Sequence, residues 1–282
     1  MKSILFIVTA FILFSCQTKT TQKTENKDAI ATTATPEMSN QQEAITFAFS
    51  SESGDSLLAF EENTNPAPFT QTLDNQGVIT KVNFIKTQKN GEEHSVNLTP
   101  YNFSNCTGQL FTLSGGKKAN SDFTSLLFNE EFIKNHQPIK LKTLEKPQII
   151  DSKVKGAIAA ARKRAIKNAW KIATFGENQN AYIVIFTPKK DSVLASLVID
   201  DGQFIYRDYP AKYDAGSTWR VDDGGEFPND AIRILAIFRN KQGKIEVITE
   251  WAGAEGANIE YSKANKNIFE IIREASRYWG AG

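Results

Sequence analysis

Residues 181–207 read AYIVIFTPKKDSVLASLVIDDGQFIYR. Short polar turns divide this stretch into three apolar runs rich in β-branched and aromatic residues, at 181–187, 192–199 and 203–207. Runs of this length between turn residues predict antiparallel strands that follow one another in the sheet. The stretch therefore predicts a three-stranded meander at the centre of the C-terminal half of the chain.

A hairpin pattern follows the meander. The runs AIRILAIFR at 231–239 and KIEVITEW at 244–251 flank the polar loop Asn-Lys-Gln-Gly. Two strand-like runs separated by a short loop that contains glycine predict a β-hairpin. We therefore expect both runs to extend the antiparallel sheet.

Two long amphipathic patterns surround these strands. Residues 151–176 carry apolar side chains at spacings of three and four, at Val154, Ile158, Ala161, Ala165, Ala169 and Ile172. Asp151 or Ser152 is the expected N-cap there, and Gly176 can end the helix in the left-handed conformation. Residues 262–279, with Ser262 as cap, have their apolar positions at Ile268, Ile271, Ile272, Ala275 and Trp279. Both segments predict amphipathic α-helices.

The N-terminal half of the chain is expected to be rich in strands. Strands are predicted at 45–50, 109–116 and 139–144. Residues 78–98 suggest a hairpin around Asn90-Gly91, the preferred pair for a type I′ turn, with Ile85 opposite Val96 and Thr87 opposite His94. A helix is predicted at 122–135, capped by Ser121 or Asp122 and stopped before Pro138.

These elements together predict an α+β fold. An antiparallel β meander would pack against the long amphipathic helices, and a β-rich N-terminal region would precede them. A boundary near Glu145-Lys146-Pro147 divides the chain into a β-rich region, 45–147, and an α+β domain, 148–282.

The N-terminus carries a secretion pattern. It reads MKSILFIVTAFILFSCQ, in which Lys2 precedes an apolar run of the size of a signal-peptide core, too short to span a bilayer. The residues Leu13-Phe14-Ser15-Cys16 resemble the lipobox of bacterial lipoproteins. The resemblance implies that a signal peptide, 1–15, is removed and that acyl chains on Cys16 bind the membrane. The alternative is an ordinary signal peptide with a chance cysteine.

The segment 16–44 would then be a lipidated cysteine followed by a disordered tether. It is rich in Thr, Gln, Lys and Asn and has no aromatic residue. Such a segment cannot bury enough apolar surface to offset the entropy lost on ordering. Gln17 is not acidic, and by analogy with lipoprotein sorting this favours the outer membrane of a bacterial envelope. The leaflet that the protein faces stays open.

A four-residue motif raises the question of esterase activity. Gly54-Asp55-Ser56-Leu57 resembles the nucleophile motif of the GDSL esterase/lipase family. A serine nucleophile needs an adjacent general base, and the resemblance would require a histidine near the C-terminus, three residues after an aspartate. The last histidine is His136, which follows Ile133 by three residues. We therefore expect Ser56 to begin a strand after a polar turn.

The segment 204–227 is the most unusual loop candidate. It gathers aromatic, acidic and basic side chains, namely Tyr206, Arg207, Asp208, Tyr209, Tyr213, Trp219, Arg220, Asp222, Asp223 and Glu226. Long loops without structure of their own are often functional. Aromatic rings beside acids and arginines suit a carbohydrate or a peptide, so these ten residues are the candidate ligand-binding set. The alternatives are a purely structural loop, a carboxylate pair for glycoside hydrolysis, or calcium binding by the acidic residues.

Composition excludes several classes of function. The net charge is +1, so no global field recruits nucleic acid. The chain has no phosphate-binding glycine loop, which gives no basis for a nucleotide cofactor. It has two cysteines and two histidines, His94 and His136, far apart in sequence, so no metal site is predicted. With Cys16 acylated, Cys106 has no disulfide partner and is expected to be buried.

The sequence thus predicts an envelope lipoprotein whose specific role is open. The leading hypothesis is a non-enzymatic binding or accessory module for an envelope glycan, peptide or protein partner, held at the membrane through Cys16. The alternative is a carboxylate-based hydrolase of envelope polysaccharide or peptidoglycan that acts through 204–227. A third hypothesis is a structural subunit that docks through the basic helix predicted at 151–176 or through a sheet edge.

Overall fold

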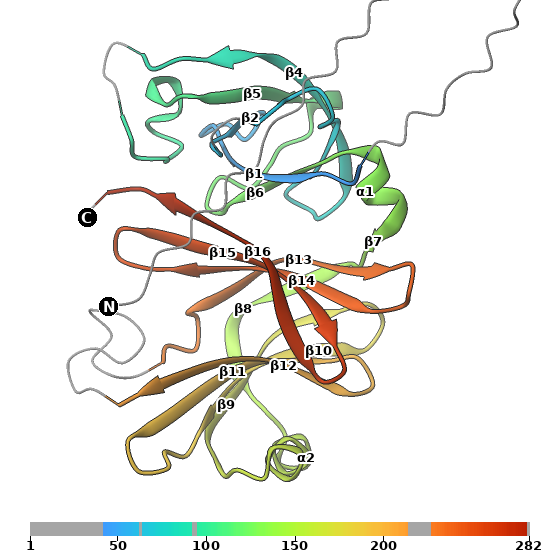
Figure 1. The fold of residues 1–282 in the computed structure, drawn as a ribbon, viewed down its shortest axis with the longest axis vertical. Coiled ribbons are helices and arrows are strands. Elements are labelled where there is room, and N and C mark those ends of the chain that lie inside the picture. Colours follow the sequence, from blue (N-terminus) through green and yellow to red (C-terminus); the bar gives the residue numbers. More distant parts are fainter. Residues whose placement is uncertain (1–41, 62–63, 92–94, 214–226, 281–282) are drawn as a thin grey trace, which may run out of the picture. The chain divides into compact units, whose positions relative to one another are not determined.

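A computed structural model describes residues 42–61, 64–91, 95–213 and 227–280. Within these ranges the chain forms sixteen β-strands, two short α-helices and two 3₁₀ turns (Figure 1). The fold is therefore nearly all β. The expectation of an α+β fold with long amphipathic helices is wrong.

The N-terminal strands close a six-stranded barrel. The strands in order around it are β1 (Ile45–Ser50), β2 (Ser56–Ala59), β5 (Gly108–Leu113), β4 (Ile79–Gln88), β3 (Gln71–Leu73) and β6 (Ser125–Phe128). Small and large apolar residues, among them Ala48, Leu57 and Phe111, fill its interior. Closure through the β1–β6 pair removes the free strand edges that an open sheet would expose.

The rest of the chain forms one ten-stranded sheet. Its order is β7 (His136–Pro138), β13 (Ile232–Asn240), β14 (Ile245–Ala252), β15 (Gly256–Asn265), β16 (Ile268–Tyr278), β12 (Phe204–Lys212), β11 (Ser192–Asp200), β10 (Gln179–Phe186), β9 (Ile166–Phe175) and β8 (Leu141–Ile149). The sheet curls, because residues from both of its halves, such as Ile183 on β10 and Val247 on β14, share one buried core. We call the face that encloses this core the concave face.

Two layers cover the other face. The helix α2 (Ser152–Arg162) packs on β9–β12 through Ile158, which is fully buried. On the other half of the sheet, Phe238, Ile248 and Tyr261 pack against β1, β6 and the short helix α1 (Glu130–Asn135). We call this second surface the barrel-facing side of the sheet.

The predicted meander and hairpin are confirmed. Strands β10, β11 and β12 occupy the three runs of the opening stretch, and β13 and β14 pair across the Asn-Lys-Gln-Gly loop. Asn240 closes this turn, since its Oδ1 accepts hydrogen bonds from the backbone N–H groups of Gln242 and Lys244, both at 3.0 Å. The strands predicted at 45–50, 109–116 and 139–144 are also largely present, as β1, β5 and part of β8.

The helix predicted at 151–176 is wrong beyond its first eleven residues. Asp151 caps α2 as expected, accepting from the N–H of Lys153 at 2.7 Å. Lys163 then adopts the left-handed conformation (φ 49°) and ends the helix. The last two apolar positions, Ala169 and Ile172, lie on β9 and contact different cores. Residues three apart lie on opposite faces of a strand, and apolar layers cover both faces of β9, so the apolar spacing resembled that of a helix.

The helix predicted at 262–279 is a β-hairpin. β15 and β16 pair along their whole length around a turn at Lys266, which has φ 56°. Ser262, the expected cap, lies buried inside β15. Ile271 and Ile272, expected to face inward together, are both exposed, and Arg277 of the same strand is buried.

Two smaller expectations also fail. Of the helix predicted at 122–135 only α1 forms, after strand β6, and its cap is Asn129, which accepts from the N–H of Phe132 at 2.8 Å. The hairpin predicted at 78–98 does not form, because β4 pairs with β3 and β5. Its predicted partner residue His94 lies outside the described residues. The predicted boundary near Glu145-Lys146-Pro147 falls within β8.

Candidate functional site

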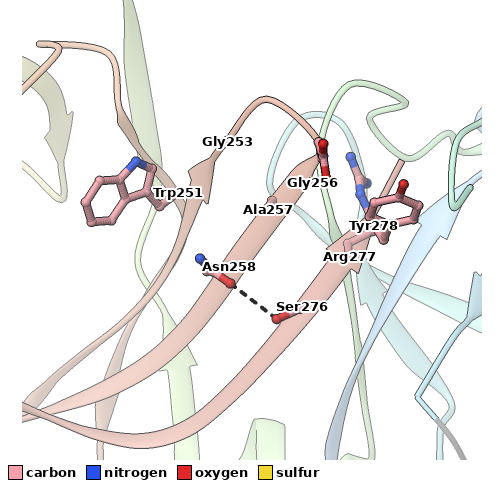
Figure 2. Close-up of a pocket in the computed structure, with 9 residues that line it drawn as sticks. Trp251, Gly253, Gly256, Ala257, Asn258, Ser276, Arg277 and Tyr278 are labelled. Atoms are coloured by element: carbon pink, nitrogen blue, oxygen red, sulfur yellow. Dashed lines mark hydrogen bonds between the residues drawn. The ribbon is translucent and has the colours of Figure 1, made fainter. Parts of the chain in front are cut away.

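A groove runs along the concave face of the sheet near one end of β12, β15 and β16. It consists of two adjoining cavities of about 330 Å³ and about 640 Å³, which share the lining residues Trp251, Asn258 and Ser276. Figure 2 shows the smaller cavity, with Trp251 at one end and Arg277 and Tyr278 at the other. We call the two cavities together the sheet groove.

The groove exists because two neighbouring strands diverge. β12 and β16 run parallel and share a single registered pair, Tyr206 with Ile268. Beyond it, residues 207–211 of β12 and 274–276 of β16 line opposite sides of the larger cavity. The unpaired strand ends leave the concave face open there, where elsewhere it encloses the core.

Aromatic rings form the floor of the sheet groove. The ring of Trp251 packs edge-on against Tyr209, with centroids 5.3 Å apart, and against Phe227 at 5.4 Å. These rings close the end of the main core. The indole Nε1 of Trp251 is buried and has no hydrogen-bond partner among the described residues. Burial raises the pKa of Tyr209, so its hydroxyl stays protonated.

Polar side chains line the walls of the groove. Arg207 holds Glu260 through two hydrogen bonds, from Nε at 2.8 Å and from Nη2 at 2.9 Å. Glu274 lies directly across from Glu260 on β16. Ser276 donates to the amide oxygen of Asn258 at 3.2 Å, and this pair is exposed (Figure 2). The walls therefore present an amide, a hydroxyl and two carboxylates beside an aromatic floor.

Arg277 also lines the smaller cavity, but its side chain lies on the barrel-facing side of β16. Only 5 % of its surface is exposed, and its Nε and Nη1 atoms have no hydrogen-bond partner among the residues described. Its guanidinium lies 5.2 Å from the centroid of the Trp279 ring. Burial lowers the pKa of Arg277; the charge of Glu250 opposes this shift and that of Arg233 reinforces it. Arginine nevertheless stays charged in proteins, so a cation is buried here.

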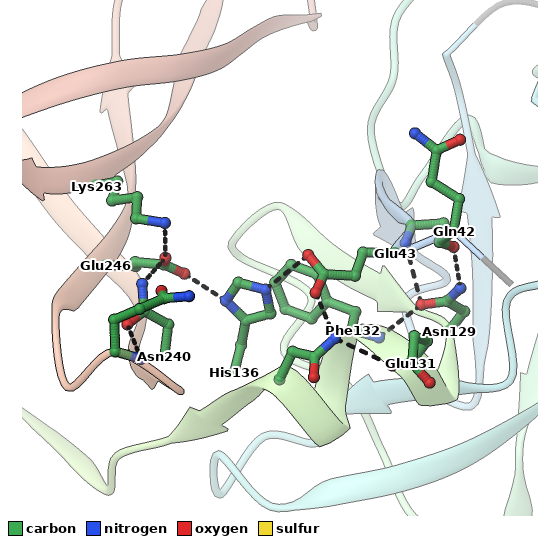
Figure 3. A network of polar contacts seen from close by, with 12 residues as sticks. Gln42, Glu43, Asn129, Glu131, Phe132, His136, Asn240, Glu246 and Lys263 are labelled. Carbon is green, nitrogen blue, oxygen red and sulfur yellow. Dashed lines mark hydrogen bonds and ion pairs between the residues drawn. The ribbon is translucent and has the colours of Figure 1, made fainter. Parts of the chain in front are cut away.

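A second cluster of buried charge lies farther along the barrel-facing side (Figure 3). The Glu246 carboxylate is within 2.5 Å of His136 Nδ1, and it accepts hydrogen bonds from Tyr261 at 2.6 Å and Asn240 at 2.7 Å. The other ring nitrogen of His136 contacts Glu43 at 3.1 Å. We call these five residues the closed cluster, since each polar side chain in it has a partner.

The pKa shifts of the closed cluster follow from these contacts. Burial opposes charging of His136, but its hydrogen bonds to Glu246 and Glu43, with their charges, outweigh burial and raise its pKa. Burial alone would raise the pKa of Glu246, yet His136, Tyr261 and Asn240 together lower it. Both groups are therefore held in their charged forms. The cluster joins the chain before β1 to β7, β13, β14 and β15, which suits a structural role.

The structure separates the predicted ligand-binding residues. Arg207, Asp208 and Tyr209 line the sheet groove, although the Asp208 carboxylate is bound by Arg162 and Ser196 and not by a groove residue. Tyr206 and Asp208 point to the opposite face of β12, since successive residues of a strand alternate. There Arg162 stacks over the Tyr206 ring at 4.6 Å and forms an ion pair with Asp208.

Of the remaining predicted residues, the structure describes Tyr213, which does not line the sheet groove. Tyr213 is 54 % exposed just after β12. Trp219, Arg220, Asp222, Asp223 and Glu226 lie outside the described residues. Part of the segment taken as a loop, up to Lys212, is in fact β12.

Sequence reasoning missed most of the groove. Trp251, Asn258, Glu260, Glu274, Ser276 and Arg277 were not candidates. The last three fell on the helix predicted at 262–279, and Trp251 and Asn258 begin and end the segment WAGAEGAN that precedes it. The available signal was that segment's Gly253 and Gly256, because glycine within a strand pattern marks close approach of another backbone. An added Cβ at Gly256 would lie 2.5 Å from the backbone oxygen of Arg277.

The structure also shows the surroundings of Ser56 and Cys106. Ser56 begins β2 after a turn at Gly54 (φ +75°), as expected, and its hydroxyl donates to Asp55 at 2.8 Å. The predicted burial of Cys106 is confirmed, and burial raises the pKa of its thiol. No cluster of metal-ligating side chains occurs within the described ranges. Cys16 lies outside them.

Comparison of the chain with protein-family models, with characterised proteins and with solved structures found no match. Among the helices that the structure describes, none has the length and apolar character needed to cross a membrane. The function is therefore inferred from the geometry of the sheet groove and from the N-terminal sequence pattern.

Proposed function

We propose that this protein is a lipid-anchored binding module of the bacterial outer membrane, and that it binds a glycan of the envelope in the sheet groove. The observation that carries the proposal is the groove itself, with aromatic rings on its floor and polar side chains on its walls. Binding sites are typically concave, largely apolar and furnished with a few polar groups.

The chemistry of the lining favours a saccharide. A sugar ring presents C–H groups that pack on aromatic rings, and hydroxyls that both donate and accept hydrogen bonds. Trp251 offers the aromatic contact, and Asn258 and Ser276 offer an exposed amide and hydroxyl. A peptide or protein partner is the competing ligand class, because an extended peptide could pair with the free edges of β12 and β16.

The experiment is calorimetric titration of the purified protein with oligosaccharides from envelope polysaccharides. Asn258→Ala should weaken binding by about tenfold, as expected for the loss of one or two hydrogen bonds. Asn83→Ala is the matched control, since Asn83 forms a similar exposed pair with Ser114 on the barrel, at 3.0 Å. Equal affinity of the two variants, or capture of envelope protein with no saccharide bound, would exclude the groove as a glycan site.

The anchor is tested separately in cells. Metabolic labelling with a clickable fatty acid should mark the wild-type protein and bring it to the outer-membrane fraction. Cys16→Ser should lose both the label and the membrane association, because two or more acyl chains are needed for stable anchoring. Unchanged labelling and fractionation of Cys16→Ser would show that lipidation at Cys16 is not the anchor.

A hydrolase is the second candidate function, and one observation favours it. Glu260 and Glu274 face each other across β15 and β16 in the groove, and directly opposed side chains have Cβ atoms about 5 Å apart. Retaining glycosidases use carboxyl groups about 5 Å apart. However, Arg207 engages both oxygens of Glu260. Turnover of an envelope polysaccharide by the wild type, abolished in Glu274→Gln, would establish hydrolysis in place of simple binding.

A further inference from the structure

We propose that Arg277 recognises a carboxylate on the bound glycan, so that the sheet groove selects acidic saccharides such as uronic acids. This inference rests on the proposed function of the groove and names its ligand class more narrowly.

The first argument is the missing partner of a buried cation. A buried charge is strongly unfavourable unless it is paired. Arg277 is 95 % buried, lines the smaller cavity of the groove, and has two buried N–H donor atoms without a partner in the described structure. The stacking with Trp279 is a contact of the ring face and occupies none of these donors.

The nearby carboxylate does not fill this role. Glu250 is the one acid whose charge acts on Arg277 appreciably, and it is itself almost fully buried. It already accepts hydrogen bonds from both the N–H (3.0 Å) and the hydroxyl of Thr124 and from Arg233 (3.2 Å). Two arginines therefore share a single carboxylate, which leaves one positive charge uncompensated.

The second argument is a further donor in the same cavity. The Nε1–H of Trp251 is also buried and unpartnered within the described residues, and Trp251 and Arg277 line the same 330 Å³ cavity. Indole and guanidinium groups only donate hydrogen bonds. A ligand group that pairs with Arg277 must therefore bring acceptor oxygens, and a carboxylate brings two together with a negative charge.

The other cavity beside Arg277 limits the charge of the ligand. A space of about 540 Å³ on the barrel-facing side is lined by Arg277 and Trp279 together with Glu52 and Asp122 of the barrel. These two acids would repel a group of higher negative charge. The surroundings therefore favour a singly charged carboxylate over a doubly charged phosphate.

The experiment compares saccharides that carry a carboxylate, the uncharged ester of that carboxylate, or a phosphate. Wild-type protein is titrated with tri-galacturonate, with its fully methyl-esterified form, which has the same ring and no charge, and with galactose 6-phosphate. We expect tri-galacturonate to bind roughly 10- to 100-fold more tightly than the ester, the usual range for a charge-assisted hydrogen bond. Arg277→Met should remove the preference, so that the acid binds no more tightly than the ester. Arg277→Lys should retain part of the preference.

The possible results distinguish a failure of the proposed role of Arg277 from a failure of the proposed glycan binding. Equal binding of acid and ester by the wild type, or an undiminished preference in Arg277→Met, overturns the role of Arg277 while the groove remains a glycan site. Preference for the phosphate over tri-galacturonate overturns the choice of a carboxylate. If none of the three ligands and no envelope oligosaccharide binds, the proposed function fails and the inference fails with it. Circular dichroism of Arg277→Met checks that the variant is folded.

Discussion

Two arginines of β16, one in the middle of the strand and one near its end, differ in their hydrogen-bond partners. Arg273 and Arg277 lie four residues apart on the barrel-facing side of one strand. Arg273 forms hydrogen bonds to both oxygens of Glu61, each at 2.7 Å, and to the backbone oxygen of Ile45. Arg277 is more deeply buried and has none of these.

The closed cluster around Glu246 belongs with Arg273 in this comparison. In both places, charge that is buried where sheet and barrel pack is fully paired within the chain. At the end of β16 that borders the sheet groove, the buried Nε and Nη1 atoms of Arg277 have no hydrogen-bond partner among the described residues. Since an unpaired buried charge costs stability, this contrast is the basis of our proposal that a ligand pairs with Arg277.

Removing the centre of the closed cluster should have the largest effect. Glu246→Leu leaves His136, Tyr261 and Asn240 buried without their shared acceptor. Breaking a buried charge pair in this way costs about 3–5 kcal/mol of the free energy of unfolding. Urea denaturation measures it, with the exposed Glu145→Ala as control, expected within about 0.5 kcal/mol of wild type. A loss below about 1 kcal/mol would contradict a structural role for the cluster.

Arg273→Met should have the next largest effect. It removes a two-point ion pair with Glu61 that is only partly shielded from water, so the expected loss is about 1–2 kcal/mol. The same denaturation measurement applies. An unchanged free energy of unfolding would show that Arg273 stabilises the fold no more than Arg277 does. It would contradict the proposed difference between the two arginines.

A smaller effect is expected from pH. The pKa of His136 is raised in the folded protein, so its contribution is fully present below the unfolded pKa of about 6.5 and is lost as pH rises through the folded value. The free energy of unfolding should therefore fall as pH rises above about 6.5 and through the raised pKa of His136. His136→Gln should show a shallower fall, although Glu246, Glu43, Tyr261 and Lys263 still surround the site. Identical slopes would exclude His136 as the titrating group.

The sequence predicted those strands whose buried residues are apolar. The runs at 181–187, 192–199 and 231–239 consist of β-branched and aromatic residues, so the composition of each short segment was enough. It failed for β16, where Arg277 is buried, Arg273 is half-buried, and Ile271 and Ile272 are exposed. A buried arginine is interpretable only through its partner, and Glu61 is 212 residues away in the chain.

Local sequence patterns likewise predicted only part of the candidate site. Arg207 and Tyr209 were predicted as ligand-binding residues from local composition, and both line the sheet groove. Tyr206 and Asp208 were predicted with them, but the alternation of a strand sends them to the other face. The rest of the lining comes from β14, β15 and β16, which the parallel pairing of β12 with β16 brings alongside. No pattern within one segment specifies such a pairing.

The most direct test of the account is the stability of Arg277→Met without any ligand. Methionine keeps the apolar stem of the side chain and removes a charge that nothing in the described structure pairs. The account predicts an unfolding free energy within about 0.5 kcal/mol of wild type, or higher by about 1 kcal/mol, as for other buried charges replaced by apolar residues. A loss of 1 kcal/mol or more, similar to that of Arg273→Met, would show that Arg277 serves the fold and would contradict the account.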